Sequence, residues 1–201
     1  MKDVQDLQRD NKREIFKRIL QDDVLQLRPN TITISESGPC DTAVDFSFFE
    51  EASGTSRLID VKDSRGQGFL DCVFSSCHRL YLESYSSLKN LSLNKFDVKP
   101  RIIKSTSESG AGSEVSVSFG LSVPTRGRSE FTCRSRSIIY ASFTAVLQSF
   151  QFYVNCEKTF RKLENILSDA RRRHRMDIEQ RCIIDMSVLT EVNSYEKANS
   201  I

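Results

Sequence analysis

The sequence contains no tryptophan, only two histidines and no pair of cysteines separated by two residues. His78 and His174 lie far apart and form neither an HxH nor an HExxH motif, so we expect no metal site. The six cysteines have no regular spacing, and several fall within apolar patterns where cysteine acts as a small hydrophobic residue. We therefore expect buried free thiols, no disulfide framework and no cofactor.

Long apolar runs are also missing. No stretch approaches the roughly 18 apolar residues of a membrane span, and the first thirty residues mix charged and apolar side chains, unlike a signal peptide. Lys and Arg total 29 against 27 Asp and Glu, a net charge of +2, which argues against a surface built for nucleic acid. We expect a cytoplasmic protein with neither a membrane nor a nucleic acid as its partner.

What the chain does contain is enough apolar material to fold. Hydrophobic residues make up 38% of its 201 residues, and thirteen are phenylalanine, which exceeds what a disordered chain carries. Residues 1–30 have the spacing of an amphipathic helix that ends before Pro29, and we interpret them as a helical arm or linker.

Residues 31–156 contain the same pattern twice. Apolar and polar residues alternate at 31–34, 43–48 and 56–61, and again at 96–103, 114–119 and 129–133, which predicts six strands. Each set is followed by apolar residues three or four positions apart, as on one face of a helix: Leu70, Val73, Cys77 and Leu80, then Ile139, Phe143, Val146, Phe150 and Tyr153.

We therefore predict an α+β fold of two β-β-β-α repeats with pseudo-two-fold symmetry, in which the helices either cover the outer faces of two sheets or pack between them. Residues 157–201 resume helical spacing and are interpreted as a C-terminal helical extension. They include the basic run 171–175, which is typical of a solvated helix face. Nucleic-acid binding through this run is the alternative.

Motifs for catalysis are missing. The sequence has no GxSxG motif, no P-loop and no acidic metal cluster, and its serine-rich stretches are most simply loops between periodic segments. We expect no catalytic residue in this chain.

Three glycine- or serine-rich segments are candidates for binding instead. Gly66-Gln67-Gly68 precedes the first predicted helix, where open backbone amides can bind an anion such as a carboxylate, or where the glycines merely form a tight turn. Residues 134–139 place hydroxyls and two cations before the second helix, as caps or as an anion site. Residues 109–113 are small enough to admit a ligand or to turn the chain.

Together, the GQGFLDC, SGAGSEVSV and SRSIIYAS segments, in this order and spacing, resemble the C-terminal allosteric (dimerisation) domain of alpha-isopropylmalate synthase and citramalate synthase. The resemblance covers about residues 31 to 156. It implies a dimeric regulatory domain for feedback control of branched-chain amino-acid biosynthesis, which binds leucine or isoleucine and acts on a TIM-barrel catalytic domain that this chain lacks. The chain is then either a stand-alone regulatory protein, with a separate catalytic synthase subunit as its partner, or part of a longer enzyme.

An amino-acid effector needs amides for its carboxylate, an acid for its ammonium group and an apolar pocket for its side chain. The resemblance and this chemistry together assign the effector site to residues of all three segments: Gly66, Gly68, Leu70, Asp71, Gly110, Ala111, Ser135, Ser137, Ile138, Ile139 and Ala141. The alternative is a dimeric scaffold or interaction module that kept the fold and lost the effector. In such a protein, Tyr140 would fill the pocket and the terminal helices would bind a partner.

Overall fold

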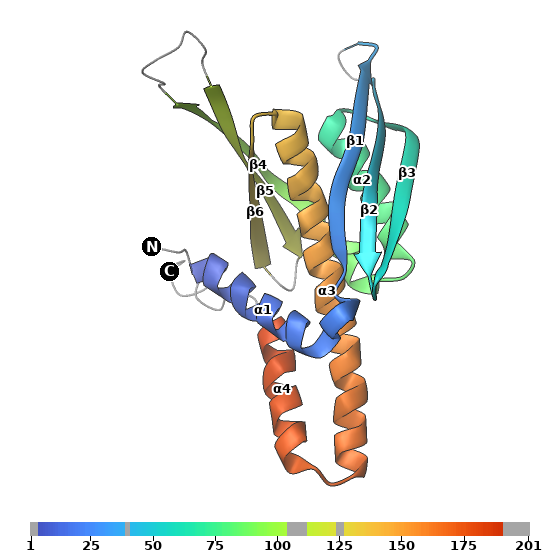
Figure 1. The fold of residues 1–201 in the computed structure, drawn as a ribbon, viewed down its shortest axis with the longest axis vertical. Helices are drawn as coiled ribbons and strands as arrows, with labels where there is room; N and C mark the ends of the chain where they lie inside the picture. Colours follow the sequence, from blue (N-terminus) through green and yellow to red (C-terminus); the bar gives the residue numbers. More distant parts are fainter. Residues whose placement is uncertain (1–3, 39–40, 104–111, 124–126, 191–201) are drawn as a thin grey trace.

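The structure is a computed structural model that describes residues 4–38, 41–103, 112–123 and 127–190. Two three-stranded antiparallel sheets and four α-helices follow one another in the predicted order, β-β-β-α twice, with further helices at both ends (Figure 1). The α+β class is therefore confirmed.

The first unit consists of β1 (Gln26–Glu36), β2 (Thr42–Ala52), β3 (Thr55–Gly66) and α2 (Phe69–Leu82). Its sheet has the order β1-β2-β3, and each strand pairs antiparallel with its neighbour. The central strand alternates as its sequence predicts, and its inward side chains are fully buried: Val44, Phe46 and Phe48.

The second unit consists of β4 (Ser92–Ile103), β5 (Gly112–Val123), β6 (Gly127–Ser135) and α3 (Ile138–Arg172). The order β4-β5-β6 repeats that of the first sheet, and β5 again buries one alternating row: Val115, Val117, Phe119 and Leu121. Helix α3 continues unbroken for 35 residues. The expected boundary between residues 156 and 157 therefore lies inside this helix.

The helices lie between the two sheets, which is the second of the two arrangements that the sequence allows. Helix α2 packs on β2 and β3, while α3 packs on β5 and β6 and also on β1 of the other sheet. Aromatic contacts cross the layers: Phe46 of β2 lies 5.4 Å from Phe143 of α3, and Phe74 of α2 lies 6.2 Å from Phe119 of β5, measured between ring centroids. Most of the buried apolar side chains form one core across these layers, and Val115, Val117 and Ala141 form a second, smaller cluster.

Further helices flank this layered core. Helix α1 (Val4–Leu20) and the short 3-10 helix η1 (Gln21–Asp23) precede β1, η2 (Ser86–Asn90) connects α2 to β4, and α4 (Met176–Thr190) follows α3. Helix α1 packs on α3 and contributes three buried side chains to the core, namely Ile15, Phe16 and Leu20. The C-terminal half of α3 and the antiparallel α4 form a helical hairpin that projects beyond the sheets (Figure 1).

Two expected core positions are exposed. Leu80 is 39% exposed, because the buried position in the last turn of α2 belongs to its neighbour Tyr81, whose hydroxyl donates to Glu50 Oε2 at 2.6 Å. Ile139 is 42% exposed in the first turn of α3. The other positions predicted for the α3 stripe, Phe143, Val146, Phe150 and Tyr153, are buried as expected.

Candidate functional site

The N-termini of α2 and α3 lie at the same end of the helix layer, because the two helices run side by side in the same direction (Figure 1). In α2, the first hydrogen bond of the helix runs from the Cys72 amide to the Gly68 carbonyl, at 3.1 Å. The amides of residues 69–71 consequently have no acceptor within the helix. A Cβ atom added to Gly68 would meet nothing within 4 Å, so there is open space beside the residue that precedes the helix.

Asp71 closes part of this helix end. Its Oδ2 accepts a hydrogen bond from the Gln67 amide at 3.2 Å, and its Oδ1 accepts one from Ser75 Oγ at 3.3 Å. A Cβ atom on Gly66 would lie 2.5 Å from Asp71 Oδ2 and 3.2 Å from Cys72 Sγ, so a side chain there would displace the Asp71 carboxylate. Asp71 is thus a capping residue, and its carboxylate remains exposed to solvent.

The start of α3 is capped differently. Ser137 Oγ accepts a hydrogen bond from the Tyr140 amide at 3.2 Å, and Ser135 Oγ accepts one from the Ser137 amide at 3.2 Å. Three consecutive large side chains then extend into solvent, since Ile138, Ile139 and Tyr140 are 49%, 42% and 44% exposed.

The remaining predicted site residues have varied positions. Leu70 is partly buried against the main core. Ala141 is fully buried against Val115 and Val117, so it lies beneath the surface and supports the first turn of α3. Gly110 and Ala111 lie outside the described residues. Of the three predicted segments, two therefore lie at the same end of the helix layer, and the third lies partly outside the described residues.

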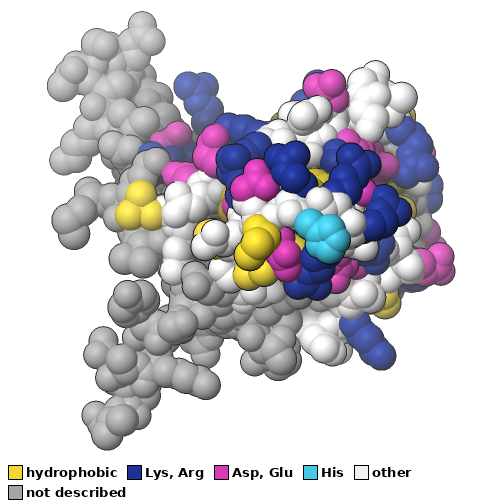
Figure 2. Space-filling view, turned by 90° about the horizontal axis from the view of Figure 1, so that it is seen from below, with side chains coloured by type: hydrophobic (Ala, Val, Ile, Leu, Met, Phe, Trp, Pro, Cys, Tyr) yellow, Lys and Arg dark blue, Asp and Glu magenta, His cyan; other side chains and the backbone are white. Residues whose placement is uncertain are grey.

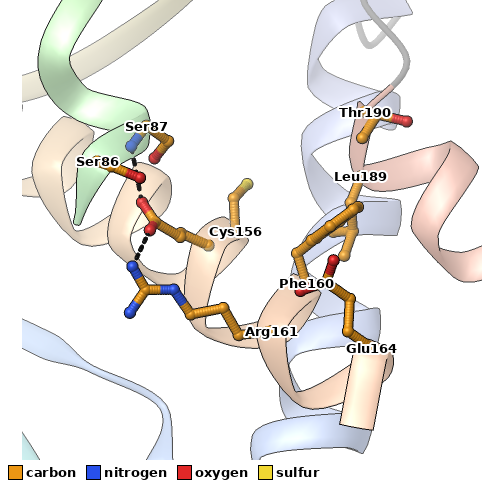
Figure 3. Close-up of a pocket in the computed structure, with 9 residues that line it drawn as sticks. Ser86, Ser87, Cys156, Phe160, Arg161, Glu164, Leu189 and Thr190 are labelled. Atoms are coloured by element: carbon orange, nitrogen blue, oxygen red, sulfur yellow. Dashed lines mark hydrogen bonds and ion pairs between the residues drawn. The ribbon is translucent and has the colours of Figure 1, made fainter. Parts of the chain in front are cut away.

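A pocket of about 310 Å³ that the sequence did not predict lies between η2, α3 and α4 (Figure 3). Glu157, from the buried face of α3, accepts a hydrogen bond from the Ser87 amide at 2.9 Å and pairs with Arg161 one turn further along the helix. Arg161 also donates to the Ser84 carbonyl at 3.0 Å. These contacts tie η2 to the middle of α3.

The electrostatics of Glu157 indicate a structural role. Burial alone would raise the pKa of its carboxyl, but the Ser87 hydrogen bonds and the charge of Arg161 outweigh burial and lower that pKa. The carboxylate is thus held ionised by its partners. The signal available in the sequence was the Glu157–Arg161 spacing of four residues within an apolar stripe.

The basic run at residues 171–175 forms the tip of the α3–α4 hairpin. Figure 2, viewed from this end of the molecule, shows basic and acidic side chains interleaved over the surface. Each arginine of the run has an acidic partner within 3.0 Å: Arg171 with Glu179, Arg172 and Arg173 with Asp169, and Arg175 with Asp177. This neutralisation fits a solvated helix end.

Cysteines and metal ligands give no second site within the described ranges. The five cysteines there are free thiols, four of them buried: Cys72, Cys77, Cys156 and Cys182, with Cys133 partly exposed. Burial raises the pKa of the Cys77 thiol. Among the described residues, no group of three or more His, Cys, Asp or Glu is placed to hold a metal ion, and no helix is long and apolar enough to cross a membrane.

No protein-family model matches this sequence, and no curated protein matches it either. What the chain does is therefore inferred from its own residues.

Proposed function

We propose that this chain is a regulatory domain of the 2-isopropylmalate or citramalate synthase type. It binds a branched-chain amino acid, leucine or isoleucine, at the end of the helix layer where α2 and α3 begin. It works as a cytoplasmic homodimer and passes the signal to a catalytic synthase subunit, since this chain lacks the catalytic barrel.

The observation that carries the proposal is the pairing of an open helix end with an exposed apolar cluster. The amides of residues 69–71 provide donors for a carboxylate, and the partial positive charge at a helix N-terminus favours an anion there. Ile138, Ile139 and Tyr140 provide apolar surface at the same end of the layer. The exposed carboxylate of Asp71 is the acid nearest to these amides along the chain and is the candidate partner for the ammonium group.

Thermal unfolding with millimolar leucine, isoleucine or valine tests the proposal directly. A ligand at about 100 times its Kd stabilises the native state by roughly 2.7 kcal/mol, which shifts the melting temperature by several degrees. We expect one L-amino acid to raise it selectively, and its D-enantiomer to have no effect. Equal melting temperatures with all three amino acids would contradict amino-acid sensing.

A pair of matched variants tests the position of the site. Ile138→Asp and Ile183→Asp each place a charge at an isoleucine of nearly equal exposure, 49% and 48%, but Ile183 lies on α4. We expect Ile138→Asp to abolish the ligand-induced shift and Ile183→Asp to leave it intact. Gly68→Val, which fits the open space around residue 68 but covers the helix amides, should abolish the shift as well.

One observation favours the alternative of a protein-interaction scaffold. Met176, Ile183 and Ile184 of α4 are 78%, 48% and 55% exposed, and Met176 and Ile183 lie seven residues apart, on one side of the helix. A scaffold would show no thermal shift with any amino acid, and the Ile183→Asp variant would lose binding to a synthase subunit that the Ile138→Asp variant still binds.

A further inference from the structure

A second pocket, of about 400 Å³, lies where the C-terminal half of α1 and the start of β1 pack against the middle of α3. Its walls come from residues 13–27, before and at the start of β1, and from residues 144–155 of α3. All of these residues are described, and none of them adjoins an undescribed segment. The volume is within the usual range for sites that bind small molecules.

The floor of this pocket is apolar. Phe16 of α1 and Phe152 of α3 are both buried, and their rings meet edge to face with 5.7 Å between the centroids. Leu27 of β1 is buried beside them. Such a floor suits the apolar body of a small molecule.

A polar row runs along the side of α3 that lines the pocket. Its members are spaced by four, three and four residues, as on one face of a helix: Thr144, Gln148, Gln151 and Asn155. Asn155 bonds to the amide and carbonyl of Leu25, and Gln151 Oε1 accepts a hydrogen bond from the Leu27 amide at 2.9 Å. These contacts hold the start of β1 to α3 and explain two members of the row.

Gln148 has no such structural contact. Its side chain is partly exposed and, within the described ranges, has no hydrogen-bond partner. The Gln151 side chain uses its oxygen on Leu27, so its NH₂ group is also without a partner among the described residues. Amide groups of both side chains are therefore available to a ligand.

The charge of the lining has one sign. Arg13 and Lys17, one turn apart on α1, line the pocket, and no acidic side chain is among its described lining residues. Both cations have acidic partners on their own helix, Asp10 at 3.5 Å from Arg13 and Glu14 at 3.0 Å from Lys17. All four side chains are 42% to 72% exposed, and ion pairs in such positions are weak, so an anionic ligand can compete for the cations.

We propose that this pocket binds a small organic carboxylate with an apolar body. The carboxylate lies between Arg13, Lys17 and the amide of Gln148, and the apolar body lies on Phe16 and Phe152. Because no acidic side chain lines the pocket, an α-amino group has no partner there, which distinguishes this ligand from an amino-acid effector. The site is thus independent of the one proposed at the start of α3.

Isothermal titration calorimetry of the full chain with phenylacetate tests the proposal, and the neutral phenylacetamide is the matched control ligand. We expect phenylacetate to bind with a Kd of about 1 mM or lower, and phenylacetamide to bind roughly 10-fold more weakly because it lacks the charge. Equal affinity for the two compounds, or no binding of phenylacetate, would overturn the proposal.

Two variants test the position of the site, and circular dichroism verifies that each one folds. Lys17→Ala should raise the Kd for phenylacetate roughly 5-fold, whereas Lys62→Ala should not change it. Lys62 is the matched control, because its side chain is 67% exposed against 69% for Lys17 and it pairs with Asp60 on β3, outside the pocket. Gln148→Glu places a like charge beside the carboxylate and should abolish binding.

The proposed amino-acid site provides the last control. Ile138→Asp should bind phenylacetate with the affinity of the wild type, because residue 138 does not line this pocket. Unchanged affinity in folded Lys17→Ala and Gln148→Glu would overturn the site. Loss of binding in Ile138→Asp but not in Gln148→Glu would place the carboxylate at the start of α3 and would overturn it too.

Discussion

The two β-β-β-α units share an order of elements but differ in how their helices begin and in what those helices support. Helix α2 has 14 residues and begins at Gly68 without a side-chain cap, whereas α3 has 35 residues and begins at the cap formed by Ser137. Helix α2 packs mainly on its own sheet, while α3 contacts both sheets, α1, α2 and α4. The helix of the first unit thus begins without a side-chain cap, and α3 is the central helix of the fold.

The largest effect on stability is expected from a charge in the buried part of α3. Val146 is fully buried on α3, so Val146→Asp places an unpaired carboxylate in the core and should destabilise the protein by about 4 kcal/mol or more. Urea unfolding followed by circular dichroism measures this. Gln148→Asp, at a partly exposed position on the same helix, is the control. Equal midpoints for the two variants would mean that Val146 is not a core residue.

Helix α3 also shows what could be predicted from the sequence. The spacing of Phe143, Val146 and Phe150 identifies one face of a helix, and that face is buried. The same rule includes Ile139, which is exposed at the N-terminus of α3. Periodicity specifies which residues share a face, but not how far the opposing sheet extends along it.

The candidate site was predictable to a smaller extent. The glycine–serine junctions could be found because caps depend on residues near in sequence, such as Ser137 and Tyr140. The length of α3 and the pocket beside it could not be predicted from the sequence. Glu157 and Asn155 have partners 70 and 130 residues away, at Ser87 and Leu25. Such pairings follow from the tertiary fold and leave no local pattern.

The next largest loss of stability is expected where the segment before β1 is hydrogen-bonded to α3. Asn155 is buried, and its side chain accepts from the Leu25 amide and donates to the Leu25 carbonyl, both at 2.9 Å. Asn155→Ala leaves both backbone groups unsatisfied and should cost about 2–3 kcal/mol. Gln148→Ala on the same helix should cost less than about 0.5 kcal/mol. A similar loss for both variants in urea unfolding would contradict this role of Asn155.

A pH-dependent effect is expected at the contact between η2 and α3. The pKa of Glu157 is lowered in the folded chain, so its ionised form contributes stability that is fully present above the unfolded pKa of about 4.3. That stability is lost as the pH falls through the lower, folded pKa. Glu157→Gln should cost about 1–2 kcal/mol at neutral pH and much less in strong acid.

Urea midpoints from neutral pH down to about pH 3 measure this dependence. Glu164→Gln, an exposed position two turns along α3, is the control and should follow the wild-type profile. A Glu157→Gln profile parallel to that of the wild type at every pH would show that the carboxylate does not contribute through its charge.

The two helix junctions themselves should respond differently to alanine. Ser137→Ala removes the cap that accepts from the Tyr140 amide and should cost about 1 kcal/mol. Gly68→Ala adds a methyl group in open space on extended backbone and should change stability by less than about 0.5 kcal/mol. Thermal unfolding without ligand compares them, and equal losses would remove the distinction between a capped and an open helix end.

The smallest effect is expected at the turn between α3 and α4, and its sign is stabilising. His174 has a φ of +55°, a left-handed conformation that favours glycine, and the Arg175 amide donates back to the Ala170 carbonyl at 2.9 Å to close the helix end. His174→Gly should therefore stabilise the chain by about 0.5–1 kcal/mol, whereas His174→Ala, which keeps the Cβ atom, should not. The amino-acid response of His174→Gly should equal that of the wild type, because the turn lies at the tip of the hairpin, away from both helix junctions. A stabilised variant with an altered amino-acid response would instead mean that the hairpin affects ligand binding at the N-terminus of α3.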